Sequence, residues 1–204
     1  MMVGRRWTEA DFVPQRRQEM SRTAGGAAIV ADLGPVLWRA SCRSFPLKRD
    51  GADALMADFE TLGGALRTFW AVPVLRPVPA SIAGDTATDL QGITVASIAA
   101  DRSGLSLAGL PADFVLTAGD WLSIATAAGG REVVRLAEGG AADAAGLSPV
   151  LACYPTLRPG VVVGQVVRAR NPRIEMRLEP ESLLRERAGG AWFTVAFSAW
   201  QVIR

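Results

Sequence analysis

The sequence predicts a mainly β protein of the α+β type with one principal helix. About ten short β-like segments follow one another, separated by Gly, Pro and Asp. Several of them alternate apolar and polar residues, which is the period of a half-buried strand, whereas only one stretch repeats its apolar residues at helical spacing. With 204 residues the chain is long enough to bury a substantial core in one domain or two small ones.

Residues 1–26 are polar and irregular. Their larger apolar residues, such as Trp7, Phe12 and Met20, are too scattered to define an amphipathic face. We interpret this segment as an N-terminal arm that orders on a neighbour, or as a tail packed on its own domain. Chain ends are often mobile, which favours the first interpretation.

The next segment contains the clearest strand and the principal helix. Residues 36–43 alternate cleanly between apolar and polar side chains, which predicts a half-buried strand. A helix is expected from a cap at Asp50 to Gly63-Gly64 or shortly after, and residues 67–73 then return to the sheet as a strand. The helix prediction rests on four apolar residues at helical spacing: Leu55, Phe59, Leu62 and Leu66.

A Pro-rich stretch at 73–91 marks a change of composition and a domain boundary. The segments beyond it are shorter and are punctuated by Gly turns, and residues 141–146 are expected to form one helical turn. Short, regular strands of this kind favour a small barrel or sandwich. The expected strands are 93–99, 114–117, 120–125, 131–137 and 150–154.

A second Pro-marked boundary at 155–160 precedes the C-terminal strands. We expect strands at 161–170, 174–178 and 192–203, with a short helix or loop at 180–187. The last strand carries large apolar groups on both faces, so it is covered on both sides. A neighbouring subunit or a central position in the sheet would each explain this pattern.

The two boundaries together predict a discontinuous architecture. A β-sandwich or split-barrel domain is formed by residues 27–80 and 161–204, and a small β-barrel-like module at 81–160 is inserted into it. The arm at 1–26 precedes both.

Composition excludes several kinds of chemistry. The chain has no histidine, so it can form neither a Ser-His-Asp triad nor an imidazole metal site. Cys42 and Cys153 are expected to be two small buried thiols in a reducing compartment, although one disulfide is arithmetically possible. The net charge of +2 is too small to predict nucleic-acid binding. Lys48 is the only lysine, and the abundant arginine fits either a coding bias or protein interfaces.

Carboxylate pairs have structural explanations. Glu179 with Glu181 lies at an expected surface turn, and Asp50 with Asp53 lies at a helix start. The other candidates, Asp113, Asp120 and Asp143, lack the spacing of a calcium loop. We therefore predict no catalytic, cofactor-binding or metal-binding residues and no cofactor.

A basic run at 168–173, with Arg177 beyond it, could contact phosphates, but solvated strand ends explain it more simply. No specific nucleic-acid binding is expected. The longest uncharged stretch, 188–203, is shorter than the roughly 20 residues of a membrane span. Glu9 and Asp11 stand where a signal peptide would be apolar, so a cytoplasmic product is expected.

Several segments, in this order, resemble the Dit-like distal tail proteins of long-tailed bacteriophages and phage-derived particles. The resemblance covers about residues 30–204, and the order of its loose motifs carries it. The longest motif is LTAGDWLSI at 116–124. The others are LWRAS (37–41), RTF (67–69), ADAAG (142–146), YPTLRP (154–159), MRL (176–178) and the aromatic last strand.

The resemblance implies a structural virion protein rather than an enzyme. Such proteins form a homo-oligomeric ring, typically a hexamer, at the distal end of the tail tube, where they join the tube protein to the hub, tail tip or baseplate. The expected location is then the tail tip of the virion, after synthesis in the bacterial cytoplasm. The alternative is a monomeric β-barrel that binds a small ligand or nucleic acid. An enzyme using Cys153 or Asp120 is a third, weaker hypothesis.

Overall fold

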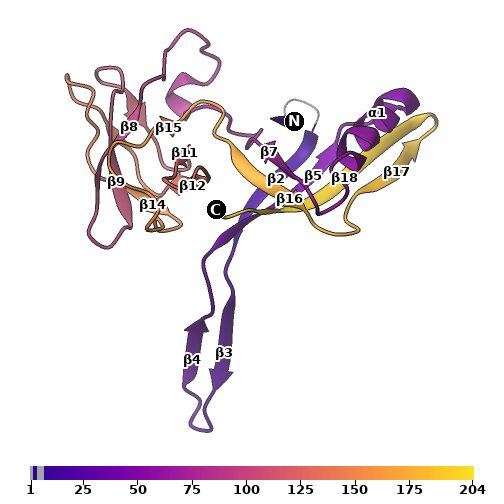
Figure 1. Ribbon diagram of the computed structural model, residues 1–204, viewed down its shortest axis with the longest axis horizontal. Coiled ribbons are helices and arrows are strands. Elements are labelled where there is room, and N and C mark those ends of the chain that lie inside the picture. Colours follow the sequence, from indigo (N-terminus) through magenta and orange to yellow (C-terminus); the bar gives the residue numbers. More distant parts are fainter. Residues whose placement is uncertain (1, 4–6) are drawn as a thin grey trace.

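The computed structural model describes residues 2–3 and 7–204 as two β-sheets side by side, with a long hairpin projecting away from them (Figure 1). Within these residues the protein is mainly β, which confirms the predicted fold class, and α1 (Arg49–Glu60) is its single α-helix. None of the helices described is long and apolar enough to span a membrane.

The first sheet is built from both ends of the sequence. Its strand order is β1-β7-β16-β18-β5-β2, and β17 and β6 also pair with β18. Only the β1–β7 pair is parallel among the described strands of this sheet. Its strands are β1 (Met2–Val3), β2 (Trp7–Gln15), β5 (Leu37–Ser44), β6 (Leu47–Lys48), β7 (Thr68–Ala71), β16 (Ile174–Leu178), β17 (Leu184–Gly189) and β18 (Trp192–Gln201).

The second sheet is formed by the middle of the chain. Its strand order is β15-β11-β12-β14-β9-β8, and neighbouring strands are antiparallel. A short β10–β13 pair and the 3-10 helix η1 (Ala80–Ile82) lie outside this order. The strands are β8 (Thr94–Ile98), β9 (Gly104–Ala108), β10 (Val115–Leu116), β11 (Trp121–Ala125), β12 (Arg131–Leu136), β13 (Gly140–Ala141), β14 (Leu151–Tyr154) and β15 (Val167–Arg168).

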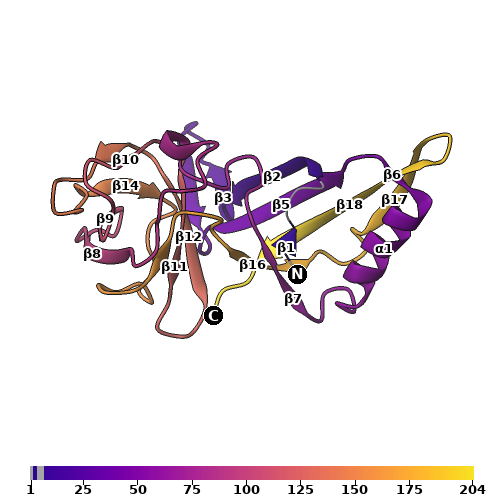
Figure 2. The ribbon, with the colours of Figure 1, turned by 90° about the horizontal axis from the view of Figure 1, so that it is seen from above.

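The core of the first sheet is an aromatic cluster beneath α1. Phe59 of α1 packs on Phe197 of β18, with ring centroids 4.5 Å apart. Trp7 of β2 contacts the same Phe197 ring edge-on at 5.1 Å. Figure 2 shows α1 against the sheet beside β18. Because these rings come from both ends of the chain, their packing closes the discontinuous sheet.

The helix is shorter than predicted, and its expected cap is absent. Lys48 occupies the N-cap position without a side-chain cap hydrogen bond, and Asp50 lies in the first turn. The helix ends at Glu60, before Gly63 and Gly64, which both adopt a φ of +64°. Glycine reaches this left-handed conformation without steric cost, so the pair terminates the helix. Leu66 consequently lies outside the helix and is 83% exposed.

The last strand lies in the middle of the first sheet. β18 hydrogen-bonds to β16 along one edge and to β5 along the other. Val195, Phe197 and Ala199 face the core, while Trp200 on the opposite face is half-buried beneath the Arg39 guanidinium. The central position, one of the two alternatives given above, is therefore observed, but the second face of the strand is only partly covered, because Trp192 is 46% exposed.

The second core extends beyond the predicted module boundary at residue 160. Val161, Val167 and Ala169 are buried together with Ile93 and Leu105 in the core of the second sheet. The strand expected at 161–170 is reduced to β15, and this strand pairs with β11 rather than with the first sheet. The sequence pattern could not reveal this, because a buried valine run is equally compatible with either sheet.

Residues 7–15, within the predicted N-terminal arm, form β2 and pack on their own sheet, which is the second of the two interpretations given above, although the segment is regular rather than irregular. β2 pairs along β5 and buries Trp7, Ala10 and Phe12. Its register shifts between Trp7 and Glu9, so two residues rather than one separate the first buried side chains. Such a bulge breaks the period-two alternation by which a strand is recognised. The remaining residues of the predicted arm, 1 and 4–6, lie outside the described residues.

Several other strands were not predicted, among them β17 and β9. β17 forms an edge of the first sheet where a short helix or loop was expected, and each of its residues is exposed. Its sequence therefore carries no apolar alternation. β9 alternates Leu105 and Leu107 with the small residues Gly104 and Ser106, but it is short and is buried along nearly its whole length. The expected helical turn at 141–146 is a tight turn in which the Asp143 carboxylate accepts from the backbone N–H of Ala145 and Leu147.

The two cysteines are buried free thiols, as predicted. Burial raises the pKa of the Cys42 thiol to about 12, and the nearby Asp11 carboxylate adds to the effect. Burial also raises the pKa of Cys153 to about 12, with a further contribution from Glu132. Both thiols are therefore protonated at neutral pH and are poor nucleophiles.

We expect neither thiol to react with a thiol-specific disulfide reagent at pH 8 while the protein is folded. Because only the thiolate attacks, reaction requires unfolding, after which both cysteines should be modified within minutes. Absorbance of the released thiolate in buffer and in guanidinium measures this difference. Rapid labelling of the folded protein would contradict the burial of these side chains.

Candidate functional site

A β-hairpin, residues 16–34, has two strands that are exposed at every residue, and we call it the hairpin arm. Its strands β3 (Gln18–Arg22) and β4 (Ala28–Asp32) pair with each other and with no other described strand. Figure 1 shows the arm projecting well beyond both sheets. Gly26 at its tip has a φ of +83° and donates its N–H to the Thr23 carbonyl oxygen at 2.9 Å, which closes the turn.

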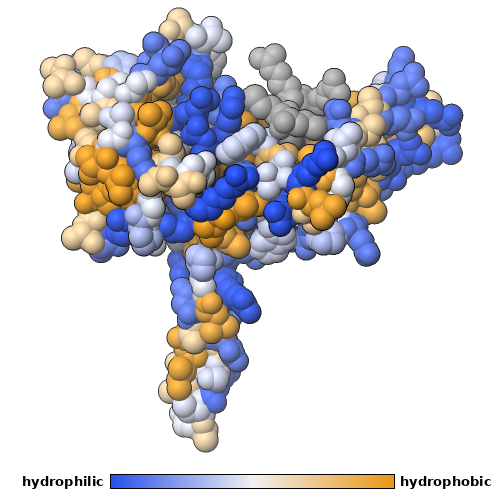
Figure 3. Space-filling model, in the orientation of Figure 1, coloured by the Kyte–Doolittle hydropathy of each residue, from blue (hydrophilic) through white to orange (hydrophobic). Residues whose placement is uncertain are grey.

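Both strands of the hairpin arm are exposed over their full length. Nevertheless the arm carries large apolar side chains, visible among the polar ones in Figure 3. Met20 and Val30 lie directly opposite each other in the register and are 61% and 56% exposed, and Ile29 is 57% exposed on the other face. An isolated two-stranded hairpin is marginally stable in water, and apolar groups on both faces favour contact with another surface.

The base of the hairpin arm is attached to both sheets. The arm continues β2 and leads into β5 of the first sheet. Arg16 donates from Nε to the Tyr154 hydroxyl of β14 at 2.8 Å, and its guanidinium lies 5.1 Å from the centre of that ring. A pocket of about 370 Å³ lies beside this attachment, lined by Arg16, Leu33, Pro35, Leu37 and Trp200 among others. These contacts therefore fix the direction in which the arm leaves the two sheets.

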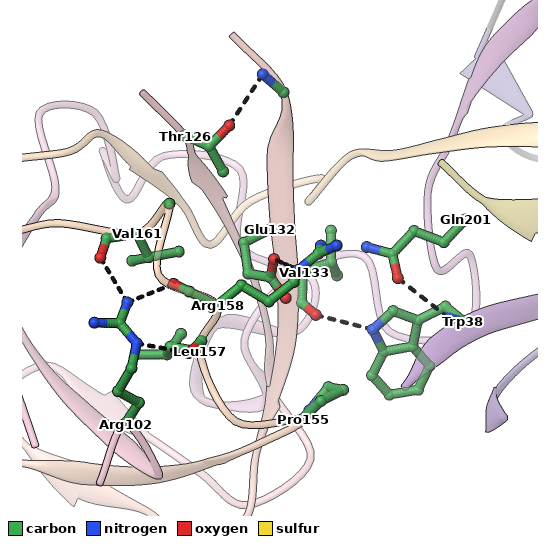
Figure 4. Close-up of polar contacts among 12 residues, drawn as sticks. Trp38, Arg102, Thr126, Glu132, Val133, Pro155, Leu157, Arg158, Val161 and Gln201 are labelled. Carbon is green, nitrogen blue, oxygen red and sulfur yellow. Dashed lines mark hydrogen bonds and ion pairs between the residues drawn. The ribbon is translucent and has the colours of Figure 1, made fainter. Parts of the chain in front are cut away.

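Trp38 joins the two sheets. This β5 side chain is fully buried, and its Nε1–H donates to the Val133 carbonyl oxygen of β12 at 2.8 Å (Figure 4). Its ring also lies 4.6 Å from that of Trp121 in β11. The Gln201 side-chain oxygen accepts from the Trp38 backbone N–H at 3.2 Å. These contacts hold the second sheet in a defined position against the first.

Asp120 forms a second connection, through the segment that leads from β7 into the second sheet. The carboxylate is fully buried and accepts from Arg76 Nε at 2.9 Å and from the Ala80 N–H at 3.0 Å. Its other oxygen accepts from the Thr117 N–H at 2.7 Å. Asp120, one of the residual candidates for catalysis, is thus engaged in fixing this segment.

The other chemistry-bearing residues are dispersed. Arg39 donates to Glu179 at 2.7 Å, and this hydrogen bond lowers the pKa of the carboxyl group. Asp53 forms an ion pair with Arg185, and Asp143 holds its own turn. In the described part of the chain, no group of three or more His, Cys, Asp or Glu side chains is arranged to hold a metal.

Residues 16–26 lie within the predicted N-terminal arm, but the β-hairpin form of the arm and its extension to residue 34 were not anticipated, although a signal for them existed. Thr23, Gly25 and Gly26 form a turn sequence between Met20 and Ile29, which are apolar residues suitable for strands. The predicted basic run did correspond to a real surface feature, because Arg168, Arg170 and Arg173 line one groove. Neither the models of known protein families nor the curated proteins include a match to this chain.

Proposed function

We propose that this protein is a structural virion component that forms a ring at the distal end of a phage tail tube and connects the tube to the hub, tail tip or baseplate. The observation that carries the proposal is the hairpin arm, an exposed β-hairpin with apolar side chains on both faces. It adds to the resemblance to distal tail proteins described above. The tube protein and the hub or tip proteins are the proposed partners.

The hairpin arm suits contact between copies of one chain in a ring. In a closed ring each subunit offers one surface to the preceding copy and a different one to the following copy. The arm would be one of these surfaces. The base of the arm is already held in place by the hydrogen bond between Arg16 and Tyr154. Binding to a neighbour would therefore cost less conformational entropy than binding by a disordered segment.

The second candidate function is a monomeric module that binds a small ligand. The arginine-lined groove of the second sheet favours it. The two functions differ in their need for the hairpin arm, because a monomeric binding module does not require an exposed apolar hairpin.

The paired apolar residues of the arm provide the test. We expect the purified chain to form a ring, and the double substitution Met20→Ser with Val30→Ser to shift it to monomers. Burial of one such side chain contributes about 1.5–3 kcal/mol. Losing both should therefore weaken each subunit contact by roughly a hundredfold or more. Light scattering gives the mass, and negative-stain images show whether a closed ring with a lumen is present.

The matched control is Leu184→Ser, which removes an exposed apolar side chain from the edge strand β17. Its ring should persist, and all variants should melt at the temperature of the native chain, because the altered side chains lack core contacts. A chain that remains monomeric at high concentration, alone and mixed with its tail tube protein, would refute the ring. A ring that is unchanged by the double substitution would remove the arm from the assembly.

A further inference from the structure

A groove of about 720 Å³ lies between two chain segments that flank the second sheet. Residues 86–92, which precede β8, form one side, and residues 166–173, which run from β15 toward β16, form the other. Figure 1 shows β8 and β15 close together at the end of the molecule that the second sheet forms. The volume falls within the range of small-molecule binding sites.

The groove is bordered by a concentration of positive charge. Arg168, Arg170 and Arg173 line it. Arg131 does not line the groove, but partial burial and the charges of Arg168 and Arg173 lower its pKa. Like charges gathered in this way repel one another, and a bound anion would relieve the repulsion.

The arginines have different roles. Arg170 donates from Nη1 to the Asp85 carbonyl oxygen at 3.0 Å and from Nη2 to the Thr88 carbonyl oxygen at 3.1 Å, so it holds the 86–92 segment in place. Arg131 donates to the Ser123 hydroxyl at 3.4 Å. Arg168 is exposed, and its side chain makes no hydrogen bond or ion pair within the described residues. Its guanidinium donors are therefore available to a ligand.

Two carboxylates near the groove are already engaged. The Asp85 side chain accepts from the Ala87 N–H at 2.7 Å and from the Thr88 hydroxyl, and these hydrogen bonds lower its pKa. Asp89 lines the groove and accepts from the Gln91 N–H at 2.9 Å. Among the described residues that line the groove, Asp89 is the single carboxylate beside three arginines, so the lining carries a formal positive charge.

The lining also limits the kind of anion. Arginine matches the geometry of phosphate and carboxylate oxygens, and phosphate is the more highly charged. Among the described residues that line the groove none is aromatic, so it offers no platform for stacking a nucleobase. The lining does include the amide side chains of Gln91 and Asn171 and the carboxylate of Asp89, which can pair with hydroxyl groups.

We propose that this groove is a binding site for a phosphorylated sugar, with the phosphate bound by Arg168 and the hydroxyl groups facing Gln91 and Asn171. The groove is larger than a phosphate ion requires. We therefore assign a polyhydroxy group to the ligand, which would fill the remaining space beside the amide side chains. This site does not depend on the ring or on the hairpin arm.

Titration calorimetry of the full chain at low ionic strength tests the site, with glucose 6-phosphate and inorganic phosphate as probes. We expect glucose 6-phosphate to bind more tightly than phosphate. Arg168→Gln should weaken its binding about tenfold or more, because a hydrogen bond to a charged group contributes about 1.5–3 kcal/mol. Since Arg168 is exposed and unpaired within the described residues, this variant should melt like the native chain.

Arg177→Gln is the matched control, because Arg177 is an exposed arginine of β16 outside the groove. It should bind glucose 6-phosphate like the native chain. Failure of both probes to bind at millimolar concentration, or equal losses in the two variants, would overturn the site. Binding of glucose 6-phosphate no tighter than that of phosphate, or weaker than that of a short single-stranded oligonucleotide, would overturn the ligand class.

Discussion

Replacing Trp38 by alanine is expected to lower the free energy of unfolding by about 3–5 kcal/mol. The side chain is fully buried between the two sheets, so its removal leaves a cavity that the surrounding strands cannot fill. It also removes the contact with the Trp121 ring and leaves the Val133 carbonyl oxygen without its donor. We further expect the variant to unfold in two steps, because Trp38 couples the two sheets.

Denaturation in urea, followed by fluorescence and by far-ultraviolet circular dichroism, measures both effects. Trp38→Phe should have an intermediate cost, since it keeps part of the apolar volume but loses the indole N–H. Trp192→Ala is the control, because this tryptophan of β18 is 46% exposed, and it should cost less than about 1 kcal/mol. Equal losses for Trp38→Ala and Trp192→Ala would contradict the role of Trp38 in joining the sheets.

Replacing Asp120 by alanine is expected to cost about 3 kcal/mol. Removing one partner of a buried ion pair typically costs 3–5 kcal/mol, because the other charge is left without compensation. The lower end applies because the Arg76 side chain is 32% exposed and can be hydrated in part. The Ala80 and Thr117 N–H groups also lose their acceptor, which adds to the cost.

Thermal and urea unfolding of Asp120→Ala should be compared with that of Asp58→Ala. Asp58 is an exposed helical residue with no side-chain hydrogen bond or ion pair within the described residues, so its substitution should change the stability by less than about 0.5 kcal/mol. Asp120→Asn keeps the shape of the side chain and should lie between the two. If Asp120→Ala is as stable as the native protein, the Arg76 segment is not held by this carboxylate.

These connections bear on the proposed function. The proposed ring subunit would transmit load between its neighbours, and the buried contacts of Trp38 and Asp120 join its two sheets. The proposed ring and the proposed sugar phosphate site can be refuted independently of each other. The substitutions at Met20 and Val30 address only the arm, whereas the substitution at Arg168 addresses only the groove.

The local pattern of the sequence was sufficient for much of the fold. The alternation around Trp38 and the spacing of Leu55 and Phe59 correctly predicted β5 and α1, because each element buries one face. The pattern failed where this condition does not hold. β17 is exposed on both faces and does not alternate. β9 is buried on both faces, so its small residues Gly104 and Ser106 lie inside together with its leucines. In β2 a bulge shifts the alternation.

For the candidate sites, too, some features could be predicted from the sequence and others could not. The absence of histidine and the presence of the basic run at 168–173 could be read from the sequence alone. The sequence could not show that Arg131 joins that run, because strand pairing in the second sheet brings residues distant along the chain together. Nor could it show that Asp120 is satisfied by Arg76.

By itself, therefore, the sequence determined the mainly β fold class, the single helix and the two buried thiols, since these depend on local periodicity and residue type. Tertiary structure alone decided which strands pair and where the second core ends. It also decided that residues 16–34 project into solvent while their neighbours in β2 and β5 are buried. The physical reason is that burial depends on what packs against a segment, and those partners lie far away in the chain.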